Sequence, residues 1–105
     1  MAMHCAYIDE ECRLDLHFDG NLDLTVSQGI CDLCRGALPD VKACIIDLSE
    51  VDRIFDSGIG LLKMLYGRLR ALGAMVVVLS DDPRIRQRFP ICRASSGSPP
   101  PRLTL

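Results

Sequence analysis

The sequence predicts an α/β domain with a mixed four-stranded β-sheet and helices mainly on one face, in the order β-β-α-β-α-β-α. Alternating apolar residues near the start of the chain predict a β-hairpin. Two near-continuous apolar runs, at 42–48 and 75–79, predict strands that are covered on both faces. A helical pattern follows each run, and this order implies parallel pairing with right-handed crossovers.

The hairpin is expected from His4–Ile8 and Arg13–Phe18, joined by the polar turn 9–11. Apolar and polar residues alternate along the second strand, so one face of the hairpin should be dry. His17 occupies a polar position and is expected to face solvent.

The first helix is expected between Thr25 and Pro39, after the segment 19–21 interrupts the strand pattern. Its apolar residues recur at helical spacing. They are Val26, Ile30, Leu33, Cys34, Ala37 and Leu38. The next apolar run, 42–48, is rich in β-branched residues and is predicted to be central in the sheet.

The second helix has the strongest helical pattern. It follows a turn-like segment at 49–52 and opens at Asp56-Ser57-Gly58. An apolar stripe runs from Ile59 to Leu72, and Gly73 stands where a helix commonly ends.

A third helix, Arg84–Phe89, should follow the strand at 75–79, because the residues between them include capping residues and a proline suited to a first turn. Residues 93–105 are rich in Ser, Gly and Pro and are predicted to form a flexible tail. One domain at 1–92 is therefore expected, since 105 residues are too few for two.

Charge is unevenly distributed along the chain. Residues 1–83 hold all 14 acidic residues and 7 basic ones, whereas 84–105 hold five arginines and no acid. A basic stripe can indicate nucleic acid binding, but here only Phe89 provides an aromatic residue among the arginines. We interpret these arginines as solvated and expect no nucleic acid partner.

No apolar run approaches the roughly 18 to 20 residues of a membrane-spanning helix, so membrane insertion is not expected. The first five residues lack the basic region and apolar stretch of a secretory signal. These features predict a cytoplasmic protein.

Six cysteines in such a protein are expected to be free thiols. Cys44 lies in an apolar strand pattern and should be a core residue. Cys31 and Cys34 form a CxxC pair inside the first helix, which fits packing, although a thiol redox protein remains an alternative. A zinc site would require a second pair, which the chain lacks.

The sequence offers no convergent set of catalytic residues. Its histidines are His4 and His17, both on the hairpin, and no common catalytic or nucleotide-binding motif occurs. We expect neither an enzymatic activity nor a cofactor.

The segment Asp56-Ser57-Gly58-Ile59-Gly60 places a hydroxyl in a turn that opens a helix. A phosphate there would meet unsatisfied backbone N–H groups, and the two glycines would allow close backbone approach. Asp or Ser ahead of a helix can equally be an ordinary N-cap, so both interpretations stay open at this point.

Three ordered segments resemble motifs of the STAS domain family of bacterial anti-sigma factor antagonists. The segment 45–62 is similar to the family's D-L-S-x-V strand end and D-S-S/T-G-L-G helix start. The segment 18–23 looks like its L-x-G-E-L-D stretch, and 73–78 is similar to its G-x-x-L-x-L-x strand. The resemblance covers about residues 5–91 and implies a STAS-like fold.

This resemblance implies a regulatory binding module. Such proteins dock, when unphosphorylated, on an anti-sigma factor that is often a serine kinase; phosphorylation at the helix start releases them, and a phosphatase resets the switch. It implies phosphorylation at Ser57, surrounded by Asp23, Asp56, Gly58 and Gly60. The expected partner-binding residues are Asn21, Asp23, Ser57, Lys63, Tyr66 and Arg70.

The chain also departs from the family pattern. A gapless match places Asp56 at the phosphorylatable Ser and Ser57 at its neighbour, and Asn21 replaces the usual Glu. Either Ser57 is phosphorylated beside Asp56, which we favour because it is the available hydroxyl, or Asp56 is a fixed partial mimic of phosphate. A shortened last helix would expose part of the sheet or favour a homodimer. The alternative within the family is the STAS subunit of a lipid-transport ABC complex, bound to its ATPase.

Overall fold

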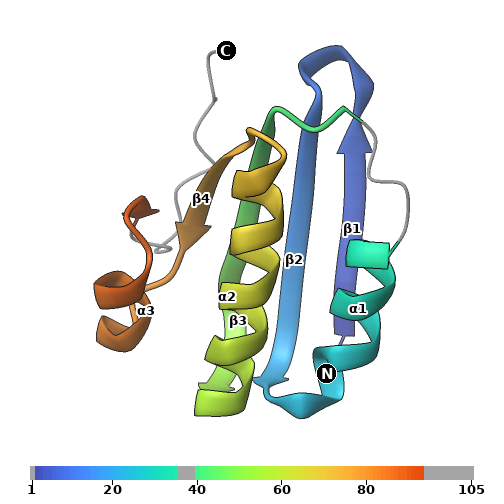
Figure 1. Cartoon of the computed structure of the whole chain (residues 1–105). Helices are drawn as coiled ribbons and strands as arrows, with labels where there is room; N and C mark the ends of the chain where they lie inside the picture. Colours follow the sequence, from blue (N-terminus) through green and yellow to red (C-terminus); the bar gives the residue numbers. More distant parts are fainter. Residues whose placement is uncertain (1, 36–39, 94–105) are drawn as a thin grey trace.

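The computed structural model describes residues 2–35 and 40–93, and shows a single five-stranded sheet in the order β1-β2-β3-β4-β5 (Figure 1). The strands are β1 (Ala2–Ile8), β2 (Arg13–Leu22), β3 (Ala43–Ile54), β4 (Met75–Leu79) and β5 (Cys92–Arg93). β1 pairs antiparallel with β2, and the other three pairs are parallel. The mixed sheet with β3 at its centre confirms the predicted fold class. The predicted count of four strands was wrong by one, because the two residues of β5 are too few to produce a periodic pattern.

Helices lie on one face of this sheet. They are α1 (Ser27–Arg35), α2 (Asp56–Ala71) and α3 (Pro83–Arg88), with short 3₁₀ helices η1 (Asp9–Glu11) and η2 (Leu24–Val26). Figure 1 shows α1 and α2 side by side in front of the strands and α3 beside β4. The first helix therefore begins with a 3₁₀ turn, and its predicted end at 36–39 lies outside the described residues.

The main core fills the space between the helices and the sheet. Leu16, Phe18 and Ile46 face it from the strands, and Leu62 and Leu69 face it from α2, each no more than 1% exposed. Cys44 is also fully buried there, as predicted. Burial of each such apolar side chain contributes about 1.5–3 kcal/mol to folding. A second, smaller cluster lies apart from this core and consists of Ile45, Val77 and Leu79.

Two predicted interruptions are in fact strand. The predicted break at 19–21 and the predicted turn at 49–52 pair with each other, since Asp19 is opposite Glu50 and Gly20 opposite Val51. Irregular register on either side of these pairs, together with the positive φ of Gly20 (75°), lets β2 continue to Leu22. Mostly exposed side chains here give no apolar alternation, so the sequence pattern missed the extension.

The candidate partner-binding site at the start of helix α2

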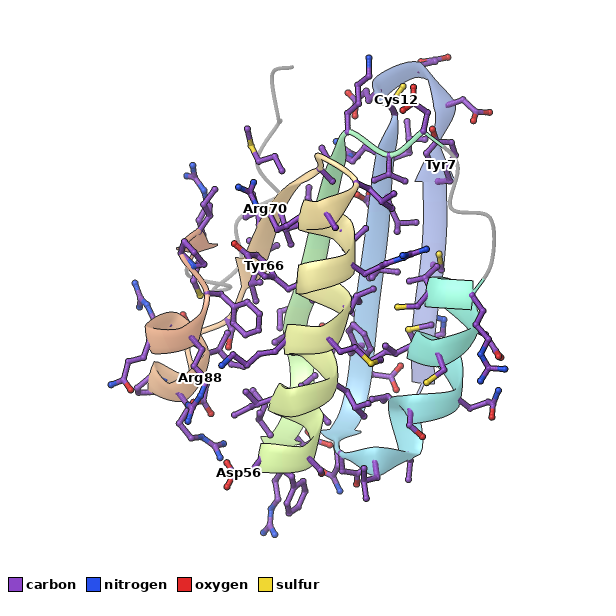
Figure 2. All side chains as sticks on the ribbon, viewed as in Figure 1. Tyr7, Cys12, Asp56, Tyr66, Arg70 and Arg88 are labelled. Atoms are coloured by element: carbon purple, nitrogen blue, oxygen red, sulfur yellow. The ribbon has the colours of Figure 1, made fainter. Side chains whose placement is uncertain are left out.

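Asp56 and Ser57 are the first two residues of α2, directly after the carboxyl end of β3. The Asp56 side chain is 91% exposed, and Figure 2 shows it at the end of α2. Ser57 is half-buried. The residue at the N-cap position is Phe55, and its side chain makes no capping hydrogen bond. The interpretation of Asp56 or Ser57 as an ordinary N-cap is therefore wrong. The N–H groups in the first turn of α2 receive no hydrogen bond from the side chain of the N-cap residue.

Gly58 holds this helix start against the end of β2. A Cβ atom at Gly58 would lie 2.3 Å from the Leu22 carbonyl oxygen and 2.7 Å from Leu22 Cγ. The Phe55 N–H donates to the same carbonyl oxygen at 2.9 Å. Only glycine fits this close approach, whereas a Cβ atom at Gly60 would meet no atom within 4 Å. At Gly58 the absence of a side chain is therefore required by packing against Leu22 of the same chain. Gly60 is exposed, and the space around it is open.

The end of β2 brings Asn21 and Asp23 to the same end of the sheet. Asn21 pairs with Arg53, just ahead of the α2 start, and is exposed. Asp23 caps η2, because its Oδ1 accepts from the Thr25 N–H at 2.8 Å and from the Thr25 hydroxyl at 2.6 Å. These hydrogen bonds lower the pKa of Asp23, so its negative charge persists beside the site.

Arg84 is a site residue that the sequence interpretation missed. It is the second residue of α3, and its Nη1 lies 3.7 Å from Asp56 Oδ1. Its Nη2 donates to the Ile54 carbonyl oxygen and lies 3.1 Å from Asp82 Oδ2. Asp82 caps α3 as predicted, since its Oδ1 accepts from the Arg84 N–H at 2.8 Å. Arg84 therefore links the starts of α2 and α3 through the end of β3.

The remaining predicted partner-binding residues follow α2 away from this end. Lys63 is exposed, and Tyr66 is half-buried against Phe89, with an edge-to-face ring arrangement and centroids 5.4 Å apart. Arg70 is exposed near the other end of the helix, where its Nη1 donates to the Ala74 carbonyl oxygen at 3.4 Å (Figure 2). At 1.5 Å per residue, Asp56 and Arg70 are about 21 Å apart along the axis. The structure thus places Asn21, Asp23 and Ser57 at the same end of the sheet, and Arg70 lies near the opposite end of α2.

Cys31 and Cys34 lie inside α1, both half-buried. Burial raises the pKa of Cys34, although the nearby Arg68 acts in the opposite direction. A raised thiol pKa is the reverse of what redox motifs require. Within 2–35 and 40–93 there is no cluster of three or more His, Cys, Asp or Glu side chains that could hold a metal ion. None of the helices described here is long and apolar enough to cross a membrane.

The expected solvent-facing His17 is half-buried instead. Its Nδ1 lies 3.3 Å from Asp47 Oδ2 on the sheet face opposite the helices. The neighbouring His4 lies on the same face, with Nε2 3.2 Å from Asp19 Oδ2. The two histidines therefore pair with carboxylates, away from the start of α2.

The STAS domain family model matches residues 6–99. The chain belongs to the STAS domain family. Comparison with curated proteins gave no match.

Solved STAS structures share the fold. Unphosphorylated SpoIIAA, an anti-sigma factor antagonist, is 18% identical, with a TM-score of 0.66 and coverage of 90% of each chain. The phosphorylated form of Bacillus SpoIIAA is also 18% identical, with a TM-score of 0.66 over 91% of this chain and 93% of that one. An antisigma-factor antagonist STAS domain from Rhodobacter sphaeroides is 18% identical, with a TM-score of 0.59 over 73% of this chain and 83% of that one. The STAS fold therefore places the start of α2 at the end of a parallel strand, beside the β2–η2 connection.

Proposed function

We propose that this STAS domain is an anti-sigma factor antagonist, a cytoplasmic, non-enzymatic module that docks on an anti-sigma factor with serine kinase activity. The observation that carries the proposal is the start of α2, where Asp56 is exposed, Ser57 is half-buried and Gly58 is packed against Leu22. The likeness to SpoIIAA, solved in unphosphorylated and phosphorylated forms, supports it.

Phosphorylation of Ser57 would change the charge of this surface strongly. A phosphate adds roughly −1.5 to −2 charges at neutral pH. It would stand beside the Asp56 carboxylate, whose neighbouring cation, Arg84, is already shared with Asp82 and the Ile54 carbonyl. Docking would then have to remove water from two adjacent anions, the phosphate and the Asp56 carboxylate, while Arg84 is the one cation beside them and is already shared. Phosphorylation should therefore release the partner. A phosphatase would restore docking.

The proposed docking surface begins at Asn21, Asp23 and Ser57 and extends along α2. Lys63 and Arg70 are exposed there and can pair with acidic groups of the partner. Tyr66 supplies an aromatic surface that Phe89 holds in place.

Mass spectrometry of the protein from its native cell, with mapping of the peptide that spans 54–63, tests the switch. We expect one phosphate, on Ser57. The partner that copurifies is then titrated with the wild type, Ser57→Ala and Ser57→Asp. Ser57→Asp should bind at least about tenfold more weakly, equivalent to about 1.4 kcal/mol, and Ser57→Ala should bind normally.

Gln87→Glu is the matched charge control, because it adds one negative charge at an exposed position of α3 that is not among the proposed partner-binding residues. Equal binding by Ser57→Asp and wild type would refute the switch. Absence of phosphate on the wild type but its appearance on Asp56→Ser would favour Asp56 as a fixed mimic. Copurification of a transport ATPase and no kinase would favour the lipid-transport alternative.

A further inference from the structure

The outer side of α2 carries a line of residues without charge, which we call the α2 ridge. Its four exposed members lie three or four positions apart and therefore follow one line along the helix; they are Gly60, Met64, Gly67 and Ala71. Met64 is 45% exposed, whereas Leu62, on the opposite side of the helix, is fully buried in the main core. A surface helix ordinarily carries charged and polar residues on its outer side, so α2 departs from the usual pattern.

Packing within the described chain does not account for the two glycines of the α2 ridge. A Cβ atom at Gly60 or Gly67 would meet no atom within 4 Å, and neither residue has a positive φ. Glycine inside a helix weakens the helix relative to alanine, so these two positions reduce the stability of α2. Figure 1 shows α1 and α3 on either side of α2 and no described element over its outer side. The predicted tail, 93–105, lies outside the described residues apart from Arg93. The low ridge around the Met64 side chain therefore suits the close approach of a surface from another molecule.

Three exposed cations border the α2 ridge. Helical spacing places Lys63 and Arg70 on one side of it and Arg68 on the other. None of the three forms an ion pair with another described residue. Arg68 and Arg70 also suit the negative end of the helix dipole, but Lys63 lies in the middle of α2, and Asp56 at its first position is the one acidic residue of the helix. Charge complementarity therefore favours an acidic surface on this ridge. It disfavours a second copy of α2, which would bring three further cations.

We propose that an acidic amphipathic helix of the docking partner packs along the α2 ridge, with its apolar side chains around Met64 and its carboxylates beside the three bordering cations. The inference rests on the proposed docking function, since this helix belongs to the partner that docks beside Ser57. Gly60 and Ala71 are about 16 Å apart along the axis, which corresponds to three turns of a partner helix. Two helices pack closely when side chains of one enter the low positions on the surface of the other. A phosphate on Ser57, three residues before Gly60, would repel the carboxylates of such a helix, which agrees with release on phosphorylation.

The probes are two synthetic helical peptides of about five turns that differ only in charge. Both carry leucines along one side, and the other positions are alanine and glutamate in one peptide, alanine and lysine in the other. Each peptide is titrated into the full chain, and the Met64 methyl signal and the Gly60 and Gly67 amide signals are followed by NMR. These signals should shift with the glutamate peptide and should not shift with the lysine peptide. Equal shifts with both peptides, or no shift with the glutamate peptide, would overturn the proposal.

Two variants of the full chain test the two parts of the contact. Gly67→Gln should abolish the shift of the Met64 methyl because its side chain occupies the ridge. Folding should not suffer, since the position is open and glutamine favours helix over glycine. Lys63→Gln/Arg68→Gln should abolish the shift by removing two of the bordering cations. A Met64 shift that persists in either variant would contradict the contact.

Arg86→Gln/Arg88→Gln is the matched control, because it removes two exposed cations from α3 and none from α2. It should leave the response of the Met64 methyl to the glutamate peptide unchanged. Loss of the response in this control as well would show that net charge, and not the ridge, holds the peptide, and would overturn the proposal.

Titration of Gly67→Gln with the partner that copurifies separates this inference from the phosphorylation switch. We expect Gly67→Gln to bind the partner at least about tenfold more weakly than the wild type. If Ser57→Asp weakens binding and Gly67→Gln leaves it unchanged, the helix contact is refuted and the switch stands. If Gly67→Gln weakens binding and Ser57→Asp does not, the switch is refuted and the helix contact stands.

Discussion

The α-carbon of Gly58 approaches the backbone of Leu22 so closely that an added methyl group would lie 2.3 Å from the Leu22 carbonyl oxygen. That oxygen also accepts the hydrogen bond from the Phe55 N–H. The end of β2 and the start of α2 are therefore joined by backbone contact, and the position of Ser57 depends on it.

Gly58→Ala should destabilise the domain, because α2 or β2 must shift to admit the methyl group. Overpacking of this kind costs about 1–3 kcal/mol. Gly60→Ala is the control, since its methyl group meets no atom within 4 Å and alanine favours helix by about 1 kcal/mol over glycine. Urea unfolding of both variants checks the prediction, and equal effects of the two substitutions would contradict it.

Arg84→Gln should lower the free energy of unfolding of the domain modestly. It removes the charge shared by Asp56 and Asp82 and the hydrogen bond to the Ile54 carbonyl oxygen, and the exposure of these ion pairs keeps the loss small. Arg86→Gln, an exposed arginine on the same helix, should change stability by less than about 0.5 kcal/mol. Chemical denaturation of both variants at low and high salt checks the prediction. If the loss of stability in Arg84→Gln is as large at high salt as at low salt, the ion pairs of Arg84 do not contribute to it.

Asp82→Asn should reduce the loss of unfolding free energy that occurs as the pH falls into the acidic range. The hydrogen bond from Arg84 lowers the pKa of Asp82, so the folded state favours its charged form. Stability from this group is therefore present above the unfolded pKa, near 4, and is lost as pH falls through the lower folded pKa. Asparagine keeps the cap and removes the charge. Urea unfolding from pH 6 to 2 should show a smaller loss of unfolding free energy for the variant than for the wild type, and equal losses would contradict the prediction.

The thiols of Cys34 and Cys44 should react slowly with iodoacetamide at pH 6. Burial raises the pKa of Cys44 to about 12, and burial also raises that of Cys34. Cys44 should stay unmodified until the protein unfolds, because the thiolate is the reacting form. Peptide mapping after timed alkylation checks this. A rapid reaction of Cys31 or Cys34 at pH 6 would support the thiol redox alternative.

Much of the fold could be predicted because its central elements carry strong periodic patterns. The alternation through Leu14, Leu16 and Phe18 and the apolar run around Ile46 identified β2 and β3. The outer parts of these strands, 19–22 and 49–54, were missed because Leu22 is their only buried residue, so they show no apolar alternation, and because their pairing depends on irregular register.

The geometry of the candidate site could be predicted where its residues are adjacent in sequence, and not where it is assembled from distant segments. Asp56, Ser57 and Gly58 are adjacent at a helix start, so sequence pattern located them. Arg84 is 28 residues further along and reaches Asp56 only because β3 and β4 are parallel neighbours. The predicted parallel pairing of β3 and β4 could have indicated this contact, since loops at the carboxyl ends of adjacent parallel strands meet at one edge of the sheet.

The parallel pairing of β3 on both sides also has a kinetic consequence. Arg13 pairs with Ala43, and Ala43 pairs with Met75, so neither partner strand is close to β3 in the chain. Both ladders require the closure of loops of about 30 residues, and the entropy of that closure must be overcome before the contacts form. Domains dominated by such contacts fold in milliseconds to seconds, and we expect the chain to fold on that timescale, far more slowly than a helical bundle of the same length.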